Sequence, residues 1–262
     1  TLPLRELARG RKNVVIVIND ITRPYPGGLM VEELARELNE GGIPDEGISL
    51  LVAYGMHRPN SKAELAGSYG EELLERFALI HHNASDPTQN VTVGHTKGGV
   101  EVCIDRAFAG ADLKILTGCI APHQFAGFSG GRKSVVPGIA GFEAIRRHHS
   151  FPIRPKDISL GVLEGNRFHQ ESLEAAAIAG TDFILNAVEN PQRELVCCVA
   201  GSLTEAFEAG VEVSRRIWTV PIPRRPEIAI VSPGRFPPDF ELHPSQKNIR
   251  RPQKGCPQRG GV

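Results

Sequence analysis

The stretch from Ala121 to His149 combines residue types that ordinary folding rarely brings together. It places His123, Lys133 and His149 around the glycine-rich run 127–131. Glycines allow backbone N–H groups to approach an anionic group closely. A lysine beside such a turn can pair with a phosphate or form a covalent bond, and histidines can transfer protons or bind a metal. The segment therefore predicts a cofactor cradle with chemistry attached to it.

Two further loops carry polar residues directly after predicted strands. Asp20 and Arg23 follow the apolar run 13–18, and His57 follows the run 48–54. A guanidinium group can clamp an anion, a carboxylate can orient a neighbouring group, and a histidine can act as a general base. Each loop taken alone is also compatible with a surface salt bridge or a structural histidine. Only the loops taken together indicate a function.

The elements that must position these residues alternate between apolar strands and amphipathic helices. This alternation predicts an α/β fold with a parallel sheet, in which ligands bind beyond the carboxyl ends of the strands. We therefore expect the loops that hold Asp20, His57 and His123 to meet on one rim. The predicted strands are 13–18, 48–54, 113–116, 158–162, 183–188, 195–200 and 228–231. The predicted helices are 29–38, one that begins after a capping box of Ser61 and Glu64, 142–147, 170–179 and 203–218.

Composition limits the class of protein. With 30 basic and 30 acidic residues the formal net charge is zero, so a nucleic-acid partner is not expected. There is no apolar run of about 18 residues, so no membrane span is expected either. The five cysteines form no CxxC pair and are expected to be reduced thiols of a cytoplasmic protein. The proline-rich stretch 220–226 predicts a boundary between a cofactor-binding catalytic domain (1–220) and a linker with the beginning of a second α/β domain (221–262).

Several alternatives remain open at the level of single residues. The glycine run matches neither GxxxxGK[ST] nor GxGxxG, so it is not a common nucleotide-binding loop. A zinc-dependent hydrolase built on His57, His123 and His149 leaves Lys133 and the glycines without a role. His148 and His149 are adjacent on a predicted helix and cannot face the same way, so one of them is expected to reach the site. The pair 81–82 is interpreted as part of a solvated polar loop.

Taken together, three strings resemble the nickel-pincer lactate racemase family. They are DITRP at 20–24, GMHRP at 55–59 and the run 121–149, and their order and spacing agree from about residue 3 to residue 247. The resemblance implies an isomerase that racemises or epimerises a 2-hydroxy acid by proton-coupled hydride transfer. The implied cofactor is a nickel-pincer mononucleotide, pyridinium-3-thioamide-5-thiocarboxylic acid mononucleotide with its nickel. Cofactor-biosynthesis proteins are the implied protein partners.

The same resemblance implies a role for each matching residue. Lys133 would be the attachment point of the cofactor, and His149 would be the protein ligand to nickel. His57 and His123 would be the two acid/base histidines on opposite faces of the substrate, with Asp20 supporting the catalytic site. The substrate carboxylate would be held by Arg23 and Lys247. The other residues implied to bind the cofactor are Thr22, Phe125, Gly130 and Gly131.

The likeness to the family ends after Lys247. His243 and Pro244 stand where the family has an aromatic residue and a glutamine, and the later tryptophan of its second domain has no counterpart. We hypothesise that the chain is a truncated or frameshifted reading of a longer gene, and that its substrate is a 2-hydroxy acid other than lactate. The alternative function is a catalytically silent fragment that binds the cofactor or a phosphate ligand.

Overall fold

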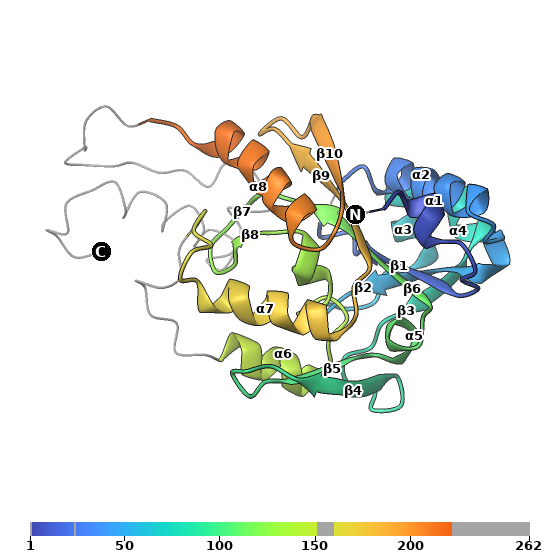
Figure 1. Cartoon of the computed structure of the whole chain (residues 1–262), viewed down its shortest axis with the longest axis horizontal. Coiled ribbons are helices and arrows are strands. Elements are labelled where there is room, and N and C mark those ends of the chain that lie inside the picture. Colours follow the sequence, from blue (N-terminus) through green and yellow to red (C-terminus); the bar gives the residue numbers. More distant parts are fainter. Residues whose placement is uncertain (1, 24, 151–159, 222–262) are drawn as a thin grey trace, which may run out of the picture. The chain divides into compact units, whose positions relative to one another are not determined.

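The computed structural model describes residues 2–23, 25–150 and 160–221 (Figure 1). All the helices and strands named below lie within one compact unit, residues 1–218. The predicted strand at 228–231, the beginning of the second domain and Lys247 lie outside the described residues, as do residues 158–159 of the predicted strand at 158–162. The strand prediction is wrong for residues 160–162, which form a turn and irregular chain, because Gly161 has a φ of 75° and its N–H donates to the Gly127 carbonyl. None of the helices in the described ranges has the length and apolar character that crossing a bilayer requires.

A six-stranded sheet of order β10–β9–β6–β1–β2–β3 forms the centre of this unit (Figure 1). The five strands from β9 to β3 are parallel, which confirms the predicted architecture. The edge strand β10 is antiparallel to β9, because only residues 190–194 connect the two strands and no helix crosses over. The strands are β1 (Val14–Asn19), β2 (Ile48–Ala53), β3 (Ala78–His81), β6 (Leu113–Cys119), β9 (Phe183–Glu189) and β10 (Leu195–Gly201).

Helices cover both faces of the sheet, and this explains why its central strands are apolar without alternation. Residues Val14 to Ile18 of β1 are at most 1% exposed. Val14, Ile16 and Ile18 pack against one set of helices, whereas Val15 and Val17 pack against the other. The first set is α1 (Leu4–Leu7), α2 (Gly27–Glu40), α3 (Lys62–Tyr69) and α4 (Glu71–Arg76). The second set is α5 (Arg106–Ala109), α6 (Phe142–His149), α7 (Arg167–Ile178) and α8 (Glu205–Trp218).

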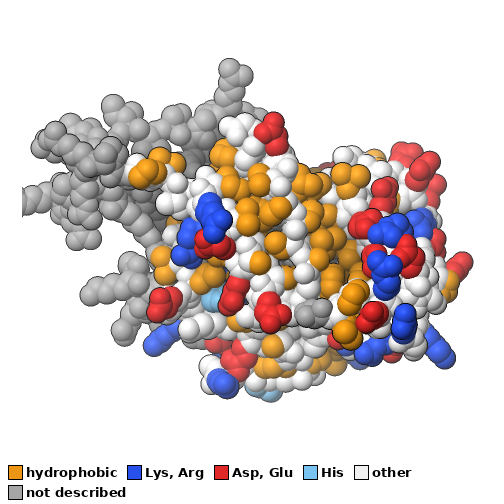
Figure 2. Space-filling model, turned by 45° about the horizontal axis from the view of Figure 1, so that its top comes forward, with side chains coloured by type: hydrophobic (Ala, Val, Ile, Leu, Met, Phe, Trp, Pro, Cys, Tyr) orange, Lys and Arg blue, Asp and Glu red, His pale blue; other side chains and the backbone are white. Residues whose placement is uncertain are grey.

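Smaller elements complete the unit. Two short antiparallel hairpins join β4 (Asn90–His95) to β5 (Glu101–Asp105), and β7 (Pro122–His123) to β8 (Gly127–Phe128). The 3-10 helices are η1 (Asp45–Gly47) and η2 (Gly131–Ser134). Figure 2 shows apolar side chains gathered on the face where β9, β10 and α8 lie, in keeping with the half-exposed Leu195 and Val196 of the edge strand.

Two local predictions have opposite outcomes. The capping box of α3 is confirmed, since Glu64 N donates to Ser61 Oγ and Ser61 N donates to Glu64 Oε2. The solvated loop expected at 81–82 is wrong: His82 is 2% exposed and lies against Asp105, with 3.0 Å between Nδ1 and Oδ2. Its Nε2 is 3.1 Å from the carbonyl oxygen of Ala140. A histidine with two such partners is a buried structural group.

Candidate functional site

The candidate site lies at the carboxyl ends of the neighbouring strands β6, β1 and β2, the rim that the sequence predicts. Hydrogen bonds connect the loops there, because Ile21 N donates to Asn60 Oδ1 at 3.1 Å and Gly55 N donates to the Gly138 carbonyl at 2.8 Å. On the side of β6, the hydroxyl groups of Tyr25 and Thr117 are 2.7 Å apart. The loops that follow three different strands are therefore fixed to one another.

Asp20 and His57 form a hydrogen-bonded pair across two of these loops. The distance from His57 Nδ1 to Asp20 Oδ2 is 2.6 Å. The Asp20 side chain is 2% exposed, whereas that of His57 is 46% exposed. Thr22 donates to the other carboxylate oxygen, Oδ1, from Oγ1 at 2.7 Å and from its backbone N at 3.2 Å. The carboxylate accepts the Nδ1–H of His57, so a neutral imidazole presents an unprotonated Nε2.

The charge of Asp20 is preserved in spite of its burial. Burial by itself raises the pKa of this carboxyl, but the hydrogen bonds from His57 and Thr22 and the nearby charge of Arg23 lower the pKa by more. The net result is a pKa below the usual value of 3.8. Asp20 is therefore an ionised carboxylate at neutral pH, able to orient His57 and to stabilise its protonated form.

Arg23 follows Thr22 on the same loop and is exposed. Its Nη1 donates to the Thr22 carbonyl and to Thr22 Oγ1, both at 3.1 Å. Among the described residues it makes no ion pair with a carboxylate. The guanidinium is thus positioned by Thr22 beside the Asp20–His57 pair, and it can accept an external carboxylate in the bidentate geometry that arginine favours.

His123 and Lys133 form a second pair, between β7 and η2. Lys133 Nζ is 2.8 Å from His123 Nε2. The other ring nitrogen, Nδ1, accepts N–H bonds from Phe125 and Ala126, both at 3.1 Å. Because Nδ1 is an acceptor, the proton of a neutral ring is on Nε2. Nε2 of a neutral His123 therefore carries a proton, whereas Nε2 of a neutral His57 carries a lone pair.

The glycines before Lys133 have a structural reason of their own. Gly130 and Gly131 have φ values of 79° and 52°, which L side chains rarely adopt. A Cβ on Gly130 would lie 2.4 Å from Asn186 Oδ1, the atom that accepts the Gly131 N–H at 2.8 Å. These glycines therefore shape the turn that presents Lys133. Direct contact of either glycine with a cofactor stays a prediction.

The two histidines at the end of α6 are distinguished clearly by their surroundings. His148 is 1% exposed, and its Nε2 lies 3.3 Å from the Phe168 carbonyl and 3.0 Å from Ser172 Oγ. Burial lowers its pKa to about 3, so it is neutral. His149 is exposed, and its Nδ1 donates to the Ile145 carbonyl at 3.0 Å. That bond leaves a lone pair on Nε2, as in histidines that bind metals, so His149 is the one suited to be a ligand.

An aromatic side chain that the sequence reasoning missed connects the two parts of the site. Phe168 of α7 lies with its ring centroid 6.2 Å from that of Phe125 and 5.2 Å from that of His149. Asn166, the N-cap of α7, donates from Nδ2 to the Phe125 carbonyl at 2.9 Å. The start of α7 therefore holds both the turn after His123 and the end of α6. Nothing in the sequence distinguishes Phe168 from a core residue.

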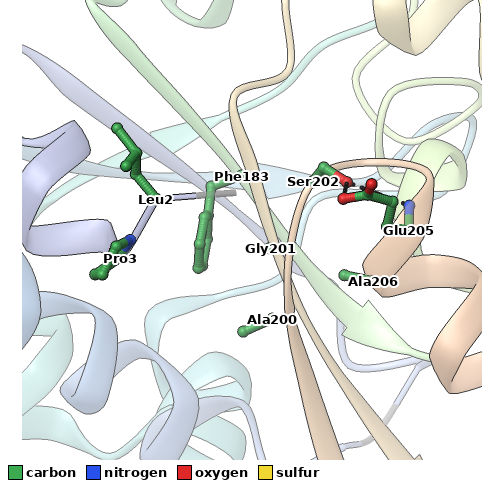
Figure 3. Close-up of a pocket in the computed structure, with 8 residues that line it drawn as sticks. All are labelled: Leu2, Pro3, Phe183, Ala200, Gly201, Ser202, Glu205 and Ala206. Atoms are coloured by element: carbon green, nitrogen blue, oxygen red, sulfur yellow. Dashed lines mark hydrogen bonds between the residues drawn. The ribbon is translucent and has the colours of Figure 1, made fainter.

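Two other arrangements do not support a site. In the described part of the chain, no three His, Cys, Asp or Glu side chains lie close enough to hold a metal ion, so convergence of His57, His123 and His149 on zinc is not supported. A hollow of about 350 Å³ is drawn in Figure 3, lined by Phe183, Gly201 and Glu205 among others. It lies where β9 begins, at the opposite edge of the sheet, and no predicted site residue of the described ranges lines it.

Comparison with known proteins gives this arrangement a family context. Two curated proteins are similar over most of the chain. It is 37% identical over 248 residues to a lactate racemase of Lactiplantibacillus plantarum, which covers 94% of this chain and 58% of that protein. It is 34% identical over 263 residues to a lactate racemase of Thermoanaerobacterium thermosaccharolyticum, which covers 100% of this chain and 61% of that protein. The chain thus spans about three fifths of the length of these curated relatives.

Solved structures give a consistent result. The lactate racemase apoprotein from Thermoanaerobacterium thermosaccharolyticum superimposes with a TM-score of 0.79 at 34% identity, over 83% of this chain and 52% of that one. A protein from Thermotoga maritima superimposes with a TM-score of 0.70 at 24% identity, over 86% of this chain and 61% of that one, which supports the fold alone. Residues 1–160 of the 262 match the lactate racemase N-terminal domain. Since the match covers more than half of the chain, the chain belongs to the lactate racemase N-terminal domain family.

Proposed function

We propose that this chain is the cofactor-binding and catalytic part of an isomerase that racemises or epimerises a 2-hydroxy acid. The observation that carries the proposal is the complementary hydrogen bonding of two histidines at the same edge of the sheet. Asp20 holds the proton of His57 on Nδ1, and the N–H groups of Phe125 and Ala126 hold that of His123 on Nε2. Nε2 of His57 can accept a proton, whereas Nε2 of His123 presents an N–H that can donate a hydrogen bond, and that can release a proton once the ring is an imidazolium.

Inversion of a 2-hydroxy acid through a planar keto acid needs both capacities. The hydroxyl proton has to leave as the Cα–H bond breaks, and a proton has to return to the oxygen when the other face is reduced. Nε2 of His57 can take the first proton, with the Asp20 carboxylate stabilising the resulting imidazolium. His123 can supply the second from Nε2 when its ring is the imidazolium, which leaves a neutral imidazole behind, and its neutral form can direct the Nε2–H at the substrate oxygen. The exposed guanidinium of Arg23 can hold the substrate carboxylate throughout.

The residues present fit the nickel-pincer nucleotide that the family resemblance implies. When bound, this group supplies a two-electron acceptor for the hydrogen on Cα. Lys133 Nζ lies 2.8 Å from His123 Nε2. Covalent attachment would use the deprotonated amine, whose lone pair can also accept the Nε2–H of His123. His149 offers a free Nε2 to nickel, since its Nδ1 is bonded to the Ile145 carbonyl. We assign Lys133 as the tether and His149 as the nickel ligand.

The remaining assignments extend this proposal. Thr22 and Phe125 lie beside the two histidine pairs and would contact the cofactor together with Gly130 and Gly131. Lys247, outside the described residues, would be a second contact for the substrate carboxylate. The partners would be a small 2-hydroxy acid and the proteins that make the cofactor. A cytoplasmic location is in keeping with free thiols at the described cysteines 103, 119, 197 and 198.

Production of the chain together with the cofactor-making proteins tests the proposal. We expect a mass increase confined to the peptide that contains Lys133, bound nickel, and loss of optical purity in at least one acid from a panel of single-enantiomer 2-hydroxy acids. Lys133→Ala should abolish the adduct. Lys114→Ala should not, because Lys114 is bonded to the Ala111 carbonyl beside the opposite end of β6. An adduct without turnover would favour the binding-only alternative, and absence of the adduct would refute the assignment of Lys133.

A further inference from the structure

The side chain of Arg132 is fully buried and takes no part in the chemistry proposed above. It is 0% exposed and is the largest of the fully buried side chains. Among the described residues it has no carboxylate partner, and burial lowers its pKa to about 9. Burying a cation without a counter-ion is unfavourable, and apolar side chains of similar volume are often as stable or more stable in such places. A contribution to folding stability therefore does not explain why a cation is buried at this position.

The hydrogen bonds of Arg132 are concentrated on one turn. Nη2 donates to the carbonyl oxygens of Ala126 and Phe128 at 2.7 Å and 3.0 Å, and Nη1 donates to that of Gly130 at 3.2 Å. The guanidinium carbon lies 4.2 Å from the ring centroid of Phe207 in α8, which fixes the plane of the group from outside the turn. The rigid fork of an arginine can hold three carbonyls at once, whereas a lysine ammonium lacks this geometry.

The same turn sets the protonation of His123. Ala126 is held from both sides, because its carbonyl accepts from Arg132 while its N–H donates to His123 Nδ1. The neighbouring N–H of Phe125 donates to the same nitrogen. If the turn moved, Nδ1 would lose both donors and could carry the ring proton itself. Nε2 would then have no proton to direct at Lys133 Nζ.

We propose that Arg132 is a positioning residue that holds the 125–126 turn against His123 Nδ1 and thereby keeps the ring proton on Nε2, facing Lys133. The importance of this proton for catalysis rests on the proposed function. The hydrogen-bond arrangement itself can be tested without cofactor, substrate or turnover. Failure of this inference can therefore be distinguished from failure of the racemase assignment.

The test is Arg132→Lys, which keeps the charge and removes the fork. Amide hydrogen exchange and long-range ¹H–¹⁵N spectra of the histidine rings are recorded on the unloaded protein, with His123→Gln used to assign the ring. We expect protection of the Phe125 and Ala126 amides to fall roughly tenfold, about the worth of one hydrogen bond to a charged group. The Nδ1 signal of His123 should lose its hydrogen-bonded position. Protection of Val15 and Val17 in β1 should stay within about twofold if the fold is kept.

Arg106→Lys is the matched control, because Arg106 also donates to backbone carbonyls, those of Thr88 and Asn90, but it precedes strand β6 whereas His123 follows it. It should leave the His123 ring signals unchanged. A folded Arg132→Lys with unaltered Phe125 and Ala126 protection would overturn the proposal. If Arg132→Lys does not fold, the exchange rate of the guanidinium hydrogens in the unmodified protein tests the proposal instead. Slow exchange at Arg132 relative to the exposed Arg146 supports the clamp, and equal exchange rates refute it.

Discussion

Replacement of Asp20 by asparagine would reverse the protonation of His57 without changing the shape of the site. Thr22 donates to Asp20 Oδ1 from both Oγ1 and N, so the amide oxygen of the variant will occupy that position. The amide NH₂ then faces His57 Nδ1, 2.6 Å from the former carboxylate oxygen, and donates to it. Nδ1 becomes an acceptor, and the ring proton moves to Nε2. His57 loses the lone pair with which it would take the hydroxyl proton.

The size of the effect follows from two contributions. A hydrogen bond to a charged group contributes about 1.5–3 kcal/mol, and here it would stabilise the imidazolium of His57. General-base catalysis by a positioned histidine contributes about 10²–10⁴-fold in rate. The two contributions describe the same interaction, so they are not multiplied. We expect kcat to fall by about 10²–10⁴-fold for Asp20→Asn. KM should change little, because Arg23 keeps its two bonds to Thr22.

The assay is conversion of one enantiomer into the other by the loaded full-length protein, followed by chiral chromatography. Asp86→Asn is a matched control, since Asp86 Oδ1 also accepts from the backbone N and Oγ1 of the residue two positions later, Thr88, but neither Asp86 oxygen accepts from a histidine among the described residues. The ring ¹⁵N signals of His57 in the unloaded protein report the tautomer independently of activity. An Asp20→Asn variant with kcat within threefold of the unmodified protein would show that this pair does not carry the base.

Three further changes test other parts of the site and fold. His149→Ala should lose nickel while the mass adduct on Lys133 persists, and retention of stoichiometric metal by elemental analysis would count against the ligand assignment. The pKa of about 3 for buried His148 means that the free energy of unfolding is highest above pH 6.5 and falls as the pH drops from 6.5 toward 3. Urea titrations should show a loss of about 2 kcal/mol by pH 5 from this group, absent in His148→Gln. Tyr25→Phe removes the 2.7 Å bond to Thr117 and should cost about 1 kcal/mol in the same assay; an unchanged midpoint would contradict this.

The parts of the site that could be predicted from the sequence are those fixed by strand order. Asp20 and His57 each follow an apolar strand, and neighbouring parallel strands end at the same edge, so their approach follows from the pattern. The predicted rim and the α3 capping box depend on local rules of this kind. The antiparallel direction of β10 was not predicted, because the apolar pattern of a strand does not indicate its direction in the sheet. Only the short connection after β9 indicates that the two strands are antiparallel.

The residues that escaped prediction owe their roles to distant partners. Arg132 stands beside Lys133 in a polar stretch that is typical of an exposed loop. In the structure, Phe207 from α8 packs against it and its side chain is fully buried. His82 lies in a sequence of loop character, yet Asp105 and the Ala140 carbonyl surround it. Phe168 has no sequence feature that separates it from a core residue. Each of these residues has a partner more than twenty positions away, beyond the reach of periodicity or spacing: Phe207 for Arg132, Asp105 for His82 and Phe125 for Phe168.

The difference between the two histidines has a consequence for the proposed reaction. In a two-base racemase each histidine has to carry an additional proton during part of the cycle. At His57 the Asp20 carboxylate favours that state, because it is ionised and bonded to Nδ1–H. At His123 the N–H groups of Phe125 and Ala126 oppose it, because Nδ1 cannot be protonated while both donate to it. The turn at 125–126 therefore has to release the ring whenever His123 becomes doubly protonated, and the clamp of Arg132 on Ala126 determines how readily that happens.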